Sequence, residues 1–151
     1  MTNDGITALM LAAQTGHLAV VEELIAHGAD VNQATNDGST ALMDAAQTGN
    51  LVVAKELIAH GADVNQSTHN GFTAWMFAEL NSHLDFLHEL ISHGEDVDIE
   101  DNDDSVTGLI SAAENGYLSV VQELIAHGAD VNQADNYGTA LMLAAENGYL
   151  S

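Results

Sequence analysis

The chain contains no cysteine and no proline, and its only lysine or arginine is Lys55. The absence of cysteine excludes disulfides and thiolate metal sites. Without proline, the turns must rely on glycine, asparagine and aspartate. The chain also has no basic N-terminal region of the kind that opens a signal peptide, and no apolar run long enough to span a bilayer. We therefore expect a cytoplasmic or host-cytosolic protein with no membrane partner.

A strongly acidic balance accompanies the lack of basic residues. The 23 aspartates and glutamates give a net charge of −22 at pH 7, and protonation of all eight histidines would still leave −14. Such a chain is not expected to bind the backbone of DNA or RNA directly. Two interpretations of the acidity remain open: a solvated surface that favours solubility, and electrostatic steering toward a protein with a basic surface.

One eleven-residue segment is written three times. Residues 23–33 return letter for letter at 56–66 and 123–133, and an altered copy occupies 89–98. The interval between copies is 33 or 34 residues, which indicates stacked repeats. We expect a single domain, 1–151, built from units at about 2–34, 35–67, 68–100 and 101–134, with a partial unit at 135–151.

The first unit shows the local pattern that the others repeat. An Asn-Asp-Gly turn at residues 3–5 precedes Thr7, a favourable N-cap for a helix over residues 8–15. A second helix is predicted over 18–27, because Leu18, Val21, Leu24 and Ile25 share one face at helical spacing. Glycine at position 28 is suited to the left-handed residue that ends a helix.

This pattern resembles the ankyrin repeat, a turn followed by two antiparallel helices. The residues that carry the resemblance are Gly5-x-Thr7-Ala8-Leu9-Met10-x-Ala12-Ala13, Gly16-His17-Leu18, Leu24-Ile25 and Gly28-Ala29-Asp30-Val31-Asn32. The Thr-Pro-Leu-His of the family reads Thr-Ala-Leu-Met in this chain. The resemblance covers essentially the whole chain. It implies an all-α fold, a solenoid of about four and a half stacked helix-turn-helix units joined by hairpin-like turns.

The third unit departs most from the pattern, since it contains the only tryptophan and all three phenylalanines. We assign Trp75, Phe77 and Phe86 to the core. Phe72 is different, because its counterparts are Ile6 and Ser39, at a turn-to-helix position that ankyrin proteins typically leave exposed. Other departures are Glu79 in place of a small alanine and Ser82 in place of the glycine between the helices.

Two patterns invite a metal hypothesis. Four histidines stand one residue before a helix-ending glycine, which favours an interaction with the helix dipole. Equivalent residues of stacked units, ~10 Å apart, are too distant to share a zinc ion. The acidic run 96–104 fails the EF-hand pattern, because its sixth position is Asp101 and its twelfth is Thr107. A solvated turn or an improvised calcium site remain the alternatives there, and we assign no metal ligand.

Catalytic motifs are missing from the sequence. It has no cysteine nucleophile, no nucleophile elbow and no glycine-rich loop for a phosphate. We therefore expect no enzyme, no catalytic residue and no cofactor.

The resemblance implies binding through the turn tips and the outward side of the first helices. Carried onto this chain, that surface combines apolar side chains with a rim of carboxylates, as protein-binding sites do. The predicted partner-binding residues are Asp4, Ile6, Gln14, Asp37, Ser39, Gln47, His69, Phe72, Leu80, Asp104, Val106, Glu114 and Tyr137.

The sequence thus favours a scaffold for protein–protein interaction. Two alternatives remain. No polar capping helix is visible at either end, so the chain could be a self-assembling element that stacks end to end, or a fragment of a longer array. Its acidity also fits a decoy that mimics nucleic acid and occupies a basic protein.

Overall fold

A computed structural model of the protein describes residues 4–93, 100–101, 106–107, 112–129, 132, 134–135 and 138–139. The chain divides into two compact parts, Met1–His93 and Gly94–Ser151. That the whole chain forms a single domain stays a prediction.

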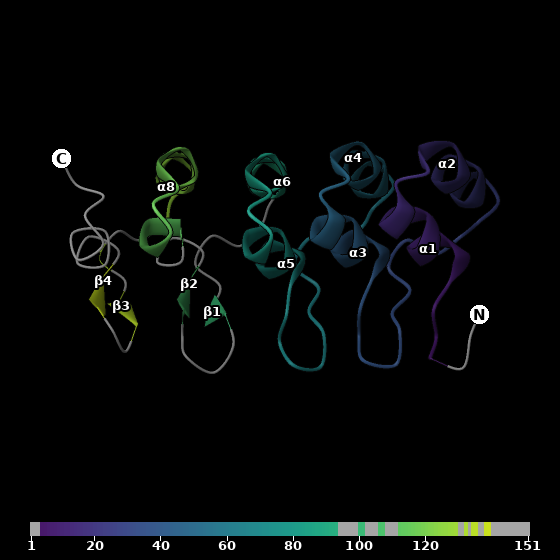
Figure 1. Ribbon diagram of the computed structural model, residues 1–151, viewed down its shortest axis with the longest axis horizontal. Helices are drawn as coiled ribbons and strands as arrows, with labels where there is room; N and C mark the ends of the chain where they lie inside the picture. Colours follow the sequence, from purple (N-terminus) through teal and green to yellow (C-terminus); the bar gives the residue numbers. More distant parts are fainter. Residues whose placement is uncertain are drawn as a thin grey trace. The chain divides into compact units, whose positions relative to one another are not determined.

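The N-terminal part consists of three pairs of antiparallel helices. In Figure 1 the first helices of the pairs form one row, the second helices form another, and the turns project from the first row. Neighbouring helices of each row pack against one another. The pairs are α1 (Ala8–Thr15) with α2 (Leu18–Ala26), α3 (Ala41–Thr48) with α4 (Leu51–Ala59), and α5 (Ala74–Leu80) with α6 (Leu84–Ser92).

The described residues of the C-terminal part form helices and short strand pairs. Its helix α8 spans Leu118–Ala126, and residues 112–114 are helical. It also contains two antiparallel pairs of two-residue strands: β1 (Glu100–Asp101) with β2 (Val106–Thr107), and β3 (Ala134–Asp135) with β4 (Gly138–Thr139). The predicted all-α solenoid with hairpin-like turns is confirmed.

Threonine begins each first helix of the N-terminal part. The Thr7 hydroxyl accepts a hydrogen bond from the Met10 amide at 3.2 Å, and Thr40 and Thr73 make the equivalent bond at 3.4 Å. These caps satisfy amides at the helix start that have no partner within the helix. The N-cap predicted at Thr7 is therefore confirmed.

The core lies between the two rows of helices. Trp75 and Phe86 are almost fully buried, as predicted. The Trp75 indole donates to the Glu79 carboxylate at 2.7 Å, which explains why a glutamate takes the place of a small alanine. Phe77 was wrongly assigned to the core: it is half-buried, and its ring centroid lies 5.8 Å from that of Phe72.

Hydrogen bonds between units fix their spacing. The Asn32 side chain donates to the Gly61 carbonyl at 3.0 Å and accepts from the Asp63 amide at 2.8 Å. The Asn50 amide donates to the carbonyl of Ala13 at 2.8 Å, at the end of the preceding first helix. These asparagines pair backbone groups that the turns and helix ends leave without a partner.

Candidate functional site

The turns and first helices of the first two units enclose a groove of about 460 Å³. Five of the residues predicted to bind a partner line it, and four further residues complete the lining. The predicted residues are Asp4, Ile6, Gln14, Asp37 and Ser39, and the additional ones are Met10, Leu11, Thr35 and Asp44.

Backbone hydrogen bonds hold the turns that form one wall of the groove. Within the second turn, the Thr35 amide donates to the Ser39 carbonyl at 2.9 Å. Between turns, the Asn36 amide donates to the Asp4 carbonyl, also at 2.9 Å. The left-handed φ of +91° at Gly38 allows the tight turn, and an added Cβ would lie 3.0 Å from the backbone of the next turn. The wall is therefore held by the backbone of two neighbouring units.

Asp44 is the one titratable residue among the four lining residues that the sequence did not predict. It lies on α3 at the position that holds Leu11 in the first unit and Phe77 in the third, and the side chain is half-buried. Burial raises the pKa of the Asp44 carboxyl from 3.8 to about 6. The available signal was a carboxylate at a position where the neighbouring units carry large apolar residues.

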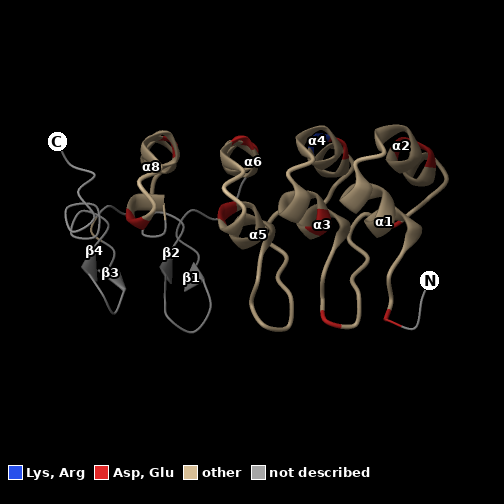
Figure 2. Ribbon diagram, in the orientation of Figure 1, with Lys and Arg blue, Asp and Glu red and all other residues tan. Residues whose placement is uncertain are grey.

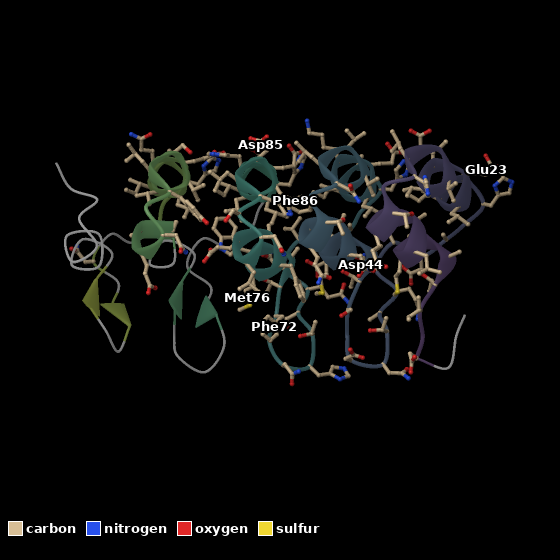
Figure 3. The ribbon with its side chains drawn as sticks, in the orientation of Figure 1. Glu23, Asp44, Phe72, Met76, Asp85 and Phe86 are labelled. Atoms are coloured by element: carbon tan, nitrogen blue, oxygen red, sulfur yellow. The ribbon has the colours of Figure 1, made fainter. Side chains whose placement is uncertain are left out.

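The third unit adds exposed apolar side chains on the same elements. Figure 3 shows Phe72 at the base of the third turn, and Asp85 and Phe86 on the second-helix row. The Phe72 side chain is 37% exposed and Leu80, at the end of α5, is 72% exposed. His69 on the turn is exposed as well. Ile6 and Ser39, the counterparts of Phe72, are half-buried, so exposure at this position is greatest at the phenylalanine.

The remaining predicted residues are divided between α3 and the C-terminal part of the chain. Gln47 is exposed on α3, and its carbonyl accepts a hydrogen bond from the His83 imidazole at 3.3 Å. Glu114 is exposed in the C-terminal part, and Val106 belongs to β2. Asp104 and Tyr137 lie outside the described residues.

The repeat architecture agrees with a comparison to known families. A family model described as ankyrin repeats (3 copies) matches residues 1–68 and 75–151. The chain belongs to the ankyrin repeat family. Ankyrin repeats are generally modules for protein–protein interaction. No curated protein sequence matches the chain.

The charges of this ankyrin repeat protein are distributed unevenly between its elements. Figure 2 shows acidic residues at two turn tips, on the first helices α3 and α5, and on the second helices. The single lysine, Lys55, lies on α4. In the described ranges no helix is long and apolar enough to cross a bilayer.

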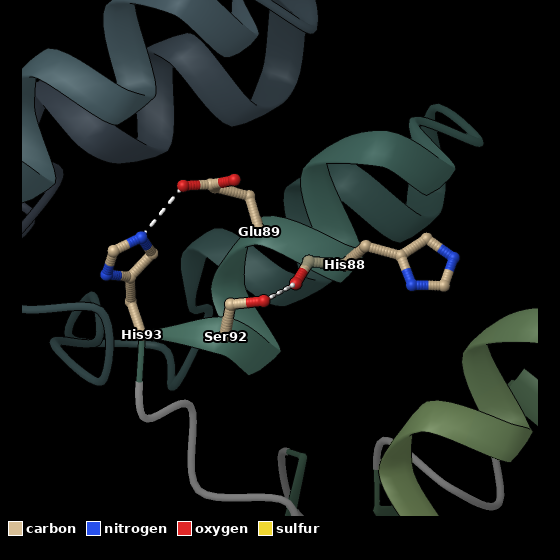
Figure 4. A network of polar contacts seen from close by, with 4 residues as sticks. All are labelled: His88, Glu89, Ser92 and His93. Atoms are coloured by element: carbon tan, nitrogen blue, oxygen red, sulfur yellow. Dashed lines mark hydrogen bonds and ion pairs between the residues drawn. The ribbon is translucent and has the colours of Figure 1, made fainter.

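The four repeated histidines lie at the ends of the second helices of this ankyrin repeat protein. Each is a C-cap residue, and three of them approach the glutamate four positions earlier. Figure 4 shows one example, in which the His93 imidazole lies 2.8 Å from the Glu89 carboxylate. The positions are His27, His60, His93 and His127. Among the described residues, no group of three His, Asp or Glu side chains is arranged to hold a metal ion.

Proposed function

We propose that this ankyrin repeat protein is a non-enzymatic scaffold that binds another protein through its turn tips and first helices. The main observation is the groove of the first two units, where five predicted binding residues line one hollow. Apolar side chains extend this surface: Leu11 is 51% exposed, and Phe72 and Leu80 are exposed on the third unit. A mixed surface of apolar centres and acidic rims supports recognition of a protein.

The partner is expected to present a basic surface. With a net charge of −22 and one lysine, the chain attracts positively charged proteins over the Debye length and repels acidic ones. Such attraction raises the association rate and suppresses wrong partners more than it raises affinity. Apolar contacts must then supply most of the affinity, and we expect Phe72 and Leu80 to make them.

The test is capture of partners from native lysate at two salt concentrations, followed by the affinity of each purified partner for variants. Phe72→Ala is expected to abolish binding with helicity unchanged by circular dichroism. Val52→Ala is the matched control, because Val52 is 60% exposed on α4, away from the first helices. Unchanged affinity of Phe72→Ala would refute the assignment. If binding were also lost steeply with salt, a decoy that mimics nucleic acid would be favoured instead.

A second candidate function, end-to-end self-association, is favoured by one observation. Val20 is 48% exposed in the first unit, whereas its counterparts Val53 and Phe86 are 2% and 1% exposed because the preceding unit covers them. Leu24 is likewise half-buried where Leu57 is fully buried. The first unit therefore leaves an apolar face that a unit of similar shape would cover.

Light scattering at several protein concentrations separates the two functions. Self-association predicts a mass that rises with concentration and a Val20→Ser variant that stays monomeric. A mass independent of concentration would remove this candidate and leave the scaffold proposal untouched.

A further inference from the structure

The groove of the first two units combines an apolar wall with three carboxylates. Ile6, Met10 and Leu11 supply the apolar wall, and Asp4, Asp37 and Asp44 the carboxylates. We propose that this groove binds an arginine or lysine side chain of the protein partner, with Asp44 as its counter-ion. This inference rests on the proposed function and specifies the chemistry of the partner at one position.

The shape and lining of the groove fit a long cationic side chain. Lysine and arginine carry an apolar stem with a charged head, so the stem can lie along Ile6 and Leu11 while the head reaches a carboxylate. The volume of about 460 Å³ lies in the usual range of ligand pockets, ~300–1,000 Å³. This volume leaves room for the residues that flank the cation in the partner.

Asp44 lacks a cationic partner of its own. In the part of the chain that the structure describes, its carboxylate takes part in no hydrogen bond or ion pair, although its backbone carbonyl accepts from Thr48 at 3.1 Å. The only lysine, Lys55, lies on α4 in the second row of helices. A half-buried carboxylate without a counter-ion is unfavourable, and a partner's cation relieves that cost.

Binding at this groove depends on the protonation of Asp44. Burial raises the pKa of Asp44 to about 6, and an adjacent cation favours the ionised form. Affinity for a cation therefore rises with pH through about 6 and is constant above about pH 7. Other titratable groups lie on the neighbouring elements, and α1 contributes none. Asp4 and Asp37 lie in the groove itself, and His69 lies on the next turn. On the helices beside α3, Glu79 of α5 accepts a hydrogen bond from Trp75, and His83 lies beside the end of α3. Helix α4 contributes Lys55 and Glu56, and Glu56 is paired with His60.

The experiment titrates the full chain with the peptide acetyl-Leu-Arg-Leu-amide and follows the NMR shifts of the Leu11, Ser39 and Asp44 amides at constant ionic strength. The citrulline analogue keeps the shape and removes the charge. We expect saturable shifts with the arginine peptide, and about tenfold weaker binding at pH 5 than at pH 7.5. Asp44→Asn is expected to bind the arginine peptide as weakly as wild type binds the citrulline peptide, with no pH dependence around 6.

Asp85→Asn is the control, because it removes the same charge from an exposed position on α6. It should leave the affinity and its pH dependence unchanged. Equal shifts with both peptides, or equal affinity of wild type and Asp44→Asn, would overturn the inference. A purified partner that loses affinity with Phe72→Ala and keeps it with Asp44→Asn would overturn the inference alone. If the partner kept its affinity for both Phe72→Ala and Asp44→Asn, the proposed function would be overturned as well.

Discussion

At the scale of single residues, Asp44 shows how one substitution within a repeat creates a distinctive environment. The position holds Leu11 in the first unit and Phe77 in the third, whereas the second unit places a half-buried carboxylate there. A carboxylate there costs stability when it ionises, and it gives the groove a charge that partners can recognise. Functional sites commonly retain such locally unfavourable groups.

Replacing Asp44 by Asn should stabilise the protein at pH 7.5. The folded-state pKa of about 6 exceeds the ordinary 3.8, so folding takes up a proton between these values and stability falls as pH rises through this window. Each unit of pKa shift corresponds to ~1.4 kcal/mol, and with allowance for partial exposure we expect a gain of about 1–3 kcal/mol. Urea unfolding of wild type and Asp44→Asn at pH 7.5 and pH 4 measures it. The gain should be nearly absent at pH 4.

The same measurement on Asp85→Asn accounts for general repulsion among the many carboxylates. Asp85 is exposed, so its substitution changes the net charge and leaves the groove intact. If the two variants gained equal stability at pH 7.5, desolvation of Asp44 would not be the cause.

Residue roles were predictable where repetition identified them. Thr7 as a cap and Trp75 as a core residue follow from their positions within the repeat, and both are confirmed. Phe77 was misassigned because helical spacing alone does not show that its ring lies beside the partly exposed Phe72. Asp44 was missed because its partial burial in a groove lined by residues of two units is not visible in the sequence of one unit.

At the scale of elements, the connection between the helices of a pair depends on a left-handed residue. Gly16 and Gly49 adopt φ of +80° and +77°, and Ser82 adopts +57° at the same position. A side chain in this region is strained, since its Cβ approaches the following carbonyl. The third unit therefore carries strain that its neighbours avoid, which agrees with its irregular sequence.

Gly49→Ala is expected to destabilise the protein more than Gly61→Ala. Both glycines have left-handed φ, +77° and +94°, so alanine at either costs about 1 kcal/mol. An added Cβ at Gly49 would also lie 2.7 Å from the His83 imidazole, whereas at Gly61 nothing lies within 4 Å. Moving the imidazole loses its bond to Gln47 at 3.3 Å, which adds about 1 kcal/mol.

Thermal or urea unfolding of the two variants measures the difference. The double variant Gly49→Ala/His83→Ala tests the cause, because the clash disappears and the two costs should not add. Equal destabilisation by Gly49→Ala and Gly61→Ala would show that the imidazole contributes nothing.

Helix boundaries were predictable because caps and glycines mark them. The predicted helix over residues 8–15 matches α1, and the one over 18–27 exceeds α2 by the capping residue His27. The contacts between units were not predictable in the same way. That Asn32 bridges to Gly61 and Asp63 requires knowing which backbone groups of the next turn lack partners.

At the scale of the whole molecule, repulsion among acidic groups opposes folding. The aspartates repeated at Asp30 and Asp63 lie in successive units, and at a spacing of ~10 Å each such pair costs about 0.4 kcal/mol in water. Each of these carboxylates also accepts a hydrogen bond at 2.9 Å, Asp30 from the Asn32 amide and Asp63 from the Asn65 amide. These hydrogen bonds stabilise the turns that contain the two aspartates. The aspartates thus stabilise their own turns and, through repulsion between units, destabilise the folded chain as a whole.

Sodium chloride should therefore raise the melting temperature. The Debye length of about 8–10 Å at physiological salt matches the repeat spacing, so screening weakens repulsion between neighbouring units. We expect the melting temperature to rise from low to moderate salt, measured by circular dichroism at pH 7.5. A melting temperature that stays constant or falls over this range would contradict this prediction.

We propose that partners bind the turn tips and first helices of this ankyrin repeat protein. Hydrogen–deuterium exchange of the chain alone and with a purified partner tests it most directly. We expect new protection in the turns around residues 35–39 and 68–72 and in α1, α3 and α5, with α2, α4 and α6 unchanged. Protection confined to the second helices, or to the face of the first unit that contains Val20, would contradict it.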